Sequence, residues 1–244
     1  MSLIIGVSYR DQFVMASNDS MVTVQTHNTD TFEREEKDVS KVDRKSEKVK
    51  RLSNNVLLCV SGIEDICKLV EKELVKRIHA NDDLYQCADV LEEVITKLNS
   101  KEVNLMNGLL NREVLSIKFL NTKFFSCYML GFNQNGNSGV VRYNPLEMKV
   151  ERMESPLNGG YPVIINGPSE DDIQFQKYLD LPDEYQDIQT FIGQFVFIHA
   201  NLSHIHSQSV STDCKFHILY KGSRMKYLQQ TVETSDFYEK FGLT

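Results

Sequence analysis

Ser2 is the first residue whose type and place suit a chemical role, because it directly follows Met1. A small second residue permits removal of Met1, and Ser2 would then carry both a hydroxyl and a free α-amine. The pKa of an α-amine is about 7.7–8.0, so a sizeable fraction is unprotonated near neutral pH and can act as a base. A hydroxyl and a base on one residue are the parts of an N-terminal nucleophile.

Two apolar runs follow Ser2 and predict a β-hairpin that would hold it. Residues 3–7 and 13–16 are apolar and partly β-branched, and the polar segment 9–12 separates them. A strand that begins at residue 3 ties the N-terminus into a sheet.

The rest of the chain predicts blocks of strands that alternate with pairs of helices. A second hairpin is expected from residues 48–52 and 56–60 around a turn-forming segment. Helices are expected at about 65–78, 90–98, 170–179 and 187–200, and further strands at 123–132, 138–143, 148–153, 161–165, 216–220 and 225–228. We expect the strands from 123–132 to 161–165 to form one meander. This order is typical of an α+β protein in which two antiparallel sheets pack face to face.

The start of the chain resembles proteasome β-type subunits and their bacterial relatives, the N-terminal-nucleophile (Ntn) hydrolases. That family has its nucleophile at residue one, then a glycine in the first strand and an Ala-Asp-Ser/Thr segment at the hairpin end. Ser2, Gly6 and residues 16–20 stand at these places. The family's catalytic lysine precedes a strand, as Lys48 does here. The resemblance, which is specific over residues 2–20 and 46–65, implies a four-layer αββα sandwich.

The resemblance also implies a set of catalytic residues. Ser2 would be the nucleophile, Lys48 would lie charged beside it, and the amide of Gly62 would hold the oxyanion. The family orients its lysine with an aspartate. Counted from Ser2, the equivalent place is Asn18, and Asp19 comes one residue late. Because strand side chains alternate between faces, we expect Asp19 to point away from Lys48 unless a bulge intervenes.

Two further hydroxyl groups complete the implied site. Either Ser209 or Ser211 would contact the amine of the nucleophile, although the family's glycine pair is missing from this stretch. Ser169 matches the hydroxyl of the family's Gly-Ser-Gly loop. It also suits a helix N-cap before Glu170.

Composition argues against several classes of partner. The chain has 244 residues, 41% of them apolar, and a net charge of −7, which argues against a nucleic-acid or anionic-membrane partner. No apolar run approaches the ~18 residues that cross a bilayer, and the N-terminus lacks the pattern of a signal peptide. We therefore expect a cytoplasmic protein with one domain over residues 1–244. The charged segment 23–47 would be an exposed loop, either solvated or used to dock a partner.

Neither a metal nor a cofactor is indicated. The five cysteines show no CxxC spacing, so they predict neither a disulfide framework nor a zinc site. His199, His204 and His206 do not share the i and i+4 spacing that places two ligands on one helix face. We expect them to be polar tips of a helix end and the loop after it.

Two functions follow from the resemblance. The first, which the sequence favours narrowly, is a peptidase subunit in which Ser2 attacks an amide carbonyl and its own amine takes the proton. Its partners would be polypeptide substrates, further copies of the chain in a self-compartmentalised ring, and an ATP-dependent unfoldase. The second is a silent ring subunit that keeps the fold for assembly or partner binding. Asn18 and the missing glycine pair favour this alternative.

Overall fold

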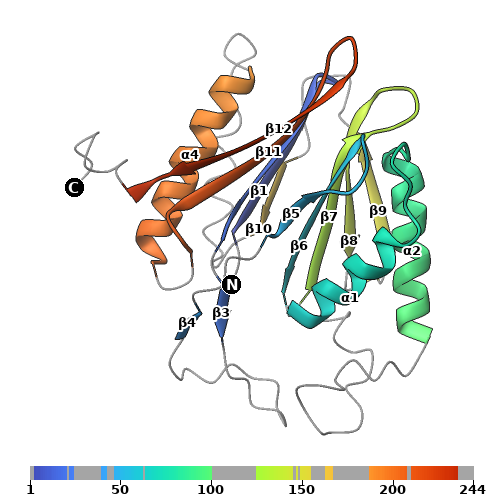
Figure 1. Cartoon of the computed structure of the whole chain (residues 1–244), viewed down its shortest axis with the longest axis horizontal. Coiled ribbons are helices and arrows are strands. Elements are labelled where there is room, and N and C mark those ends of the chain that lie inside the picture. Colours follow the sequence, from blue (N-terminus) through green and yellow to red (C-terminus); the bar gives the residue numbers. More distant parts are fainter. Residues whose placement is uncertain are drawn as a thin grey trace, which may run out of the picture.

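The structure is a computed structural model, and it describes a mixed α+β protein. The described residues are 3–20, 22–24, 40–42, 47–62, 64–100, 125–144, 147, 149–154, 163–166, 187–207 and 210–235. Within them lie two five-stranded antiparallel sheets, a two-stranded sheet and three helices (Figure 1). None of these helices is long and apolar enough to cross a membrane.

The first five-stranded sheet contains both ends of the described chain. Its strand order is β10-β1-β2-β11-β12. The bounds are Val163–Asn166 for β10, Ile4–Tyr9 for β1, Phe13–Asp19 for β2, Asp213–Lys221 for β11 and Met225–Glu233 for β12. The two hairpins predicted at the start and end of the chain are therefore confirmed, and β2 and β11 bring them together in one sheet.

The second sheet is a meander of consecutive strands. Its order is β5-β6-β7-β8-β9. The bounds are Val49–Arg51, Val56–Gly62, Phe125–Phe132, Ser138–Asn144 and Lys149–Glu154. We expected the strand near residues 161–165 to continue this meander, and that prediction is wrong because β10 pairs with β1 in the other sheet.

The segment predicted as a loop over residues 23–47 also contains regular structure. The strands β3 (Val22–Val24) and β4 (Ser40–Val42) pair antiparallel at its two ends. The polar sequence between them gave no sign of this pairing, because a three-residue ladder is too short to show a period. Residues 25–39 and 43–46 lie outside the described part of the chain, as does the helix expected at 170–179.

The β1–β2 hairpin turns through two residues with left-handed backbone. Arg10 and Asp11 have φ of 42° and 56°, and the N–H of Gln12 donates to the carbonyl of Tyr9 at 2.9 Å. Two successive residues with positive φ, as in a type I′ turn, match the right-handed twist of the flanking strands. The carboxylate of Asp11 then accepts from the N–H of Ser138 at 2.5 Å, which ties this hairpin to the second sheet.

Three helices cover the outer faces of the two sheets. The helix α4 (Ile188–Ile205) lies on the first sheet, and α1 (Glu64–Val75) and α2 (Leu84–Ser100) lie on the second (Figure 1). The carboxylate of Asp187 caps α4 by accepting from the N–H of Thr190 at 2.7 Å. This agrees with the helix start predicted at residue 187.

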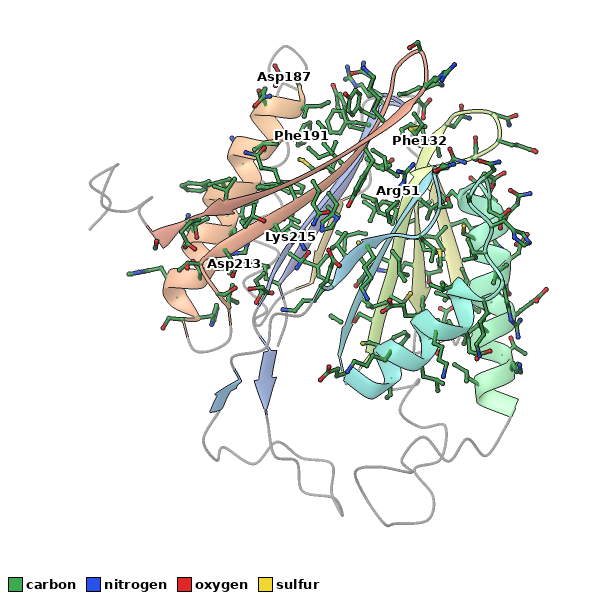
Figure 2. All side chains as sticks on the ribbon, viewed as in Figure 1. Arg51, Phe132, Asp187, Phe191, Asp213 and Lys215 are labelled. Atoms are coloured by element: carbon green, nitrogen blue, oxygen red, sulfur yellow. The ribbon has the colours of Figure 1, made fainter. Side chains whose placement is uncertain are left out.

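Side chains of β1 alternate between two apolar clusters. Leu3, Ile5 and Val7 pack with the α4 residues Phe191 and Phe195, and Phe191 points from α4 toward the sheet in Figure 2. Ile4, on the opposite face of β1, belongs to the core between the two sheets. That core contains Ile4, Val14, Ala16, Val49, Leu57, Cys59, Leu130, Phe132, Val140, Ile164 and Leu219. Every residue of β1 is buried, and burial of both faces explains the unbroken apolar run at residues 3–7.

Candidate functional site

A buried ion pair joins the two sheets at one end of the molecule. The ammonium of Lys48 lies 2.6 Å from Oδ1 of Asp19, and the two side chains are 6% and 0% exposed. Lys48 directly precedes β5 of the second sheet, and Asp19 is the last residue of β2 in the first. Two charges this close and this well shielded from water interact much more strongly than a surface pair.

The same carboxylate oxygen also binds the first described residue of the chain. The N–H of Leu3 donates to Oδ1 of Asp19 at 2.8 Å, and the N–H of Asp19 donates to the carbonyl of Leu3 at 3.3 Å. Leu3 is fully buried among the residues that contact α4. The ammonium of Lys48 therefore lies beside the start of β1, because Lys48 and Leu3 share one acceptor.

Asp19, and not Asn18, contacts Lys48, so our expectation that Asp19 points away from Lys48 is wrong. The side-chain amide of Asn18 donates to the backbone carbonyl of Asp19 at 2.8 Å, and its Oδ1 is buried without a partner. The β1–β2 ladder is continuous from the pair Ile4 and Asn18 to the turn. Asp19 therefore reaches Lys48 without a bulge in this ladder. The error came from counting the register from Ser2, whereas Asp19 is bonded to Leu3.

Ser211 forms a second layer of polar contacts around Asp19. Its N–H lies 3.5 Å from Oδ2 of Asp19, and its hydroxyl accepts from the N–H of Ser20 at 3.1 Å. The same hydroxyl donates to the carboxylate of Asp213. Of the two serines left open by the sequence, Ser211 therefore lies at the site.

His199 connects this layer to α4. Its Nε2 lies 2.9 Å from the carbonyl of Ser211, which can only accept, so Nε2 carries the proton. Burial lowers the pKa of His199, while the hydrogen bond to Ser211 and the carboxylates of Asp19 and Asp213 oppose that shift. We expected His199 to be a polar tip near a helix end, and it is buried instead. The signal was present, because Phe191, Phe195 and His199 follow one another at intervals of four residues.

Burial is opposed by neighbouring groups in its effect on the pKa values of Lys48 and Asp213. Burial lowers the pKa of Lys48 from its ordinary value of 10.5, and the charges of Asp19 and Asp213 oppose this. Burial raises the pKa of Asp213, but hydrogen bonds from Ser20 and Ser211 hold it below its ordinary value of 3.8. Figure 2 shows Asp213 near the C-terminal end of α4, opposite the end at which Asp187 caps the helix.

Gly62 lies at the same end of the second sheet as Lys48. The N–H of Val60 donates to the carbonyl of Lys48 at 2.9 Å, so β6 ends two residues beyond this contact. Gly62 is exposed and has φ of 126°, a conformation that favours glycine. Its role as an oxyanion donor stays a prediction. Ser2, Ser169 and Ser209 lie outside the described residues, and their roles stay predictions too.

The five cysteines are all unpaired and take no part in the Lys48–Asp19 site. Burial raises the pKa of Cys67 and Cys87 to about 12, so both are thiols at neutral pH. Among the residues that the structure describes, no cluster of three or more His, Cys, Asp or Glu side chains could hold a metal ion.

No protein-family model and no curated protein matches the chain.

Proposed function

We propose that this chain is a catalytically silent relative of the proteasome β-type subunits, which keeps the four-layer αββα sandwich of Ntn hydrolases for assembly or partner binding. The observation that carries the proposal is the shared oxygen of Asp19, which accepts from both Lys48 and the N–H of Leu3. Supporting the sandwich are two facing sheets, with α4 on one outer face and α1 and α2 on the other (Figure 1).

The place of the nucleophile follows from the partner of the lysine. In the family pattern, a fixed number of residues separates the nucleophile from the aspartate that orients the lysine. Counted from Ser2, that number ends at Asn18. Counted back from Asp19, the same interval reaches Leu3. Leu3 has no hydroxyl, its nitrogen is an amide, and its side chain is buried against the α4 cluster. A site with this register has the lysine and the aspartate but no attacking group.

The Lys48–Asp19 pair has a structural role in this proposal. It connects β2 to the segment before β5, and its carboxylate also holds the start of β1. Removing one partner of a buried pair leaves an uncompensated charge, which typically costs about 3–5 kcal/mol. A chain that has lost its nucleophile can therefore retain the lysine and the aspartate for stability alone.

A second candidate remains the Ser2 peptidase, and one contact favours it. The nitrogen of Leu3 is bonded to the carbonyl carbon of Ser2, so Ser2 directly adjoins the residue that shares Asp19 with Lys48. In this candidate Lys48 has its carboxylate partner, the amine of Ser2 is the base, and the amide of Gly62 holds the oxyanion. Polypeptide substrates, a homo-oligomeric ring and an ATP-dependent unfoldase belong to this candidate.

Hydrolysis of fluorogenic peptides, together with the intact mass, distinguishes the two functions. We expect the wild type to cleave a panel of such peptides no faster than its Ser2→Ala variant. Turnover that requires Ser2, in a preparation whose mass shows loss of Met1, would overturn the silent-subunit proposal. Denaturant unfolding of both proteins controls for folding, because Ser2→Ala removes only one oxygen atom.

A further inference from the structure

The strand β12 is a long edge strand of the first sheet (Figure 1). Among the described residues, it pairs with β11 on one side and with no strand on the other. It is nine residues long, contains no proline or glycine, and carries charge only at Lys226 and Glu233. Natural edge strands are usually short, bulged or charged, because unpaired backbone groups recruit another strand.

The register of β11 and β12 shows which backbone groups face outward. The N–H of Thr234 donates to the carbonyl of Thr212 at 2.8 Å, and this contact continues the register in which Asp213 pairs with Glu233. In an antiparallel ladder, pairs of opposite residues alternate between hydrogen-bonded and non-hydrogen-bonded, and Thr212 with Thr234 is a hydrogen-bonded pair. Even-numbered residues of β12 therefore bond to β11. The odd-numbered residues direct their N–H and C=O groups to the open side, and they are Met225, Tyr227, Gln229, Thr231 and Glu233.

We propose that a second copy of this chain pairs with β12 through its own β12, antiparallel, about a two-fold axis at Gln229. Such an axis is perpendicular to the sheet. Each odd-numbered residue then faces an odd-numbered residue of the other copy, and each even-numbered residue faces an even-numbered one. Gln229 is the middle residue of the strand, and pairing centred there matches Met225 with Glu233 and uses the whole strand. The outward groups of the odd-numbered residues then form up to roughly ten main-chain hydrogen bonds.

The side chains of β12 suit this register. Leu228, which is 51% exposed, becomes a diagonal neighbour of Leu228 in the second copy, so the two cover each other beside the axis. Lys226 faces Val232 and Glu233 faces Met225, so no like charges oppose one another. The ammonium of Lys226 also lies over the Tyr220 ring of its own chain, 5.6 Å from the centroid. An isologous contact of this kind closes on itself instead of forming a fibre.

This inference does not depend on the proposed function, because it uses only β12. A self-complementary register favours a second copy over an unrelated extended peptide. A peptide would pair with the same backbone groups but would not bring an exposed leucine to both sides of the axis.

Disulfide cross-linking of Gln229→Cys tests the register directly. A hydrogen-bonded pair has its Cα atoms about 5.5 Å apart, within the range of about 4.4–6.8 Å that a disulfide spans. Thr231→Cys is the matched control, because it is on the same face of the same strand but its two copies are on the order of 13 Å apart. Wild type gives the background, since four of the five native cysteines are buried and Cys67 is partly buried.

We expect Gln229→Cys to give a covalent dimer under mild oxidation at micromolar concentration, and Thr231→Cys and wild type to stay monomeric on a non-reducing gel. Equal cross-linking at both sites, or none at Gln229→Cys, would overturn the proposal.

A second pair of variants tests the hydrogen bonds without a covalent link. Thr231→Pro removes an outward N–H but no bond to β11, and proline is tolerated where an edge N–H faces solvent. Thr231→Ala keeps that N–H and is the control. We expect sedimentation equilibrium to show at least a tenfold weaker self-association for Thr231→Pro than for Thr231→Ala. The same association constant for both variants, each with wild-type circular dichroism, would contradict pairing through β12.

Discussion

Three donors meet at the carboxylate of Asp19: the ammonium of Lys48 and the N–H groups of Leu3 and Ser211. Lys48 lies in the segment before β5, Leu3 at the start of β1 and Ser211 in the segment before β11. The carboxylate also compensates an ammonium that burial would otherwise tend to discharge. A single side chain therefore holds together three parts of the chain that are far apart in sequence.

Asp19→Asn should destabilise the protein by about 3–5 kcal/mol, because Lys48 would keep its burial and lose its charged partner. The control is Asn18→Ala, which loses one hydrogen bond to the backbone of Asp19 and should cost about 1 kcal/mol. Urea unfolding measures both values. If the two variants lost similar stability, the ion pair would contribute no more to folding than the single hydrogen bond of Asn18.

His217 should make stability depend on pH. Its pKa is lowered from 6.5 to about 4, because burial disfavours the imidazolium and Lys215 repels it, while Glu47 opposes the shift. As pH falls from 6.5 to about 4, the unfolded chain takes up a proton that the folded chain does not. Stability is therefore lost within this window and levels off below it.

The loss attributable to His217 should be about 1–3 kcal/mol between pH 7 and pH 4. The free energy of unfolding of His217→Gln, followed over the same range, should fall less than that of wild type. Parallel curves for the two proteins would show that His217 does not titrate in this way. The variant also loses the contact between Nδ1 and the hydroxyl of Tyr227, so the slopes are compared and not the absolute values.

At the scale of elements, two glycines allow backbones and sheets to approach closely. A Cβ on Gly6 of β1 would lie 3.0 Å from Cδ2 of Leu130, across the core between the sheets. A Cβ on Gly131 of β7 would lie 2.4 Å from the carbonyl oxygen of Asn55. The first neighbour is a flexible side chain that can move, whereas the second is backbone in the turn before β6.

Gly131→Ala should therefore destabilise the protein by about 1–3 kcal/mol, because the turn before β6 must shift. Gly193→Ala is the matched substitution in α4, where no atom lies within 4 Å of the added Cβ. It should stabilise the protein by about 1 kcal/mol, because alanine favours the helix. Thermal unfolding of both variants measures the difference, and effects of the same sign would contradict this account.

At the scale of the whole molecule, the core between the sheets is closed by polar contacts at both ends. The Lys48–Asp19 pair closes one end, and the bond from Ser138 to Asp11 closes the other. No strand in the described part of the chain pairs with the outer side of the long edge strand β12. Assembly is therefore expected through an outer surface of the sandwich, and not through exchange of core strands.

Sedimentation velocity on the wild type should show species larger than the 28.1 kDa chain. Pairing through β12 alone stops at a dimer, because a two-fold contact uses the same surface on both copies. A ring of the kind implied by the family resemblance would give larger particles that persist in Thr231→Pro. A protein that stayed monomeric at all micromolar concentrations would count against both forms of assembly.

The sequence by itself determined the elements whose signals are local. The run at residues 3–7, the turn residues between β1 and β2, and the apolar spacing of α1, α2 and α4 depend on neighbours within a few residues. The resemblance likewise placed Lys48 next to a strand. Such features are legible because strand alternation and helix period are properties of short segments.

Only the tertiary structure decided which residue contacts Lys48 and where β10 pairs. A shift of one residue along β2 exchanges Asn18 for Asp19, and the sequence has no local feature that fixes the register. β10 pairs with β1 across more than a hundred residues, and His199 meets Ser211 across a helix end. These contacts depend on how the sheets and α4 pack together, since the energy that selects them comes from burial and charge between distant segments.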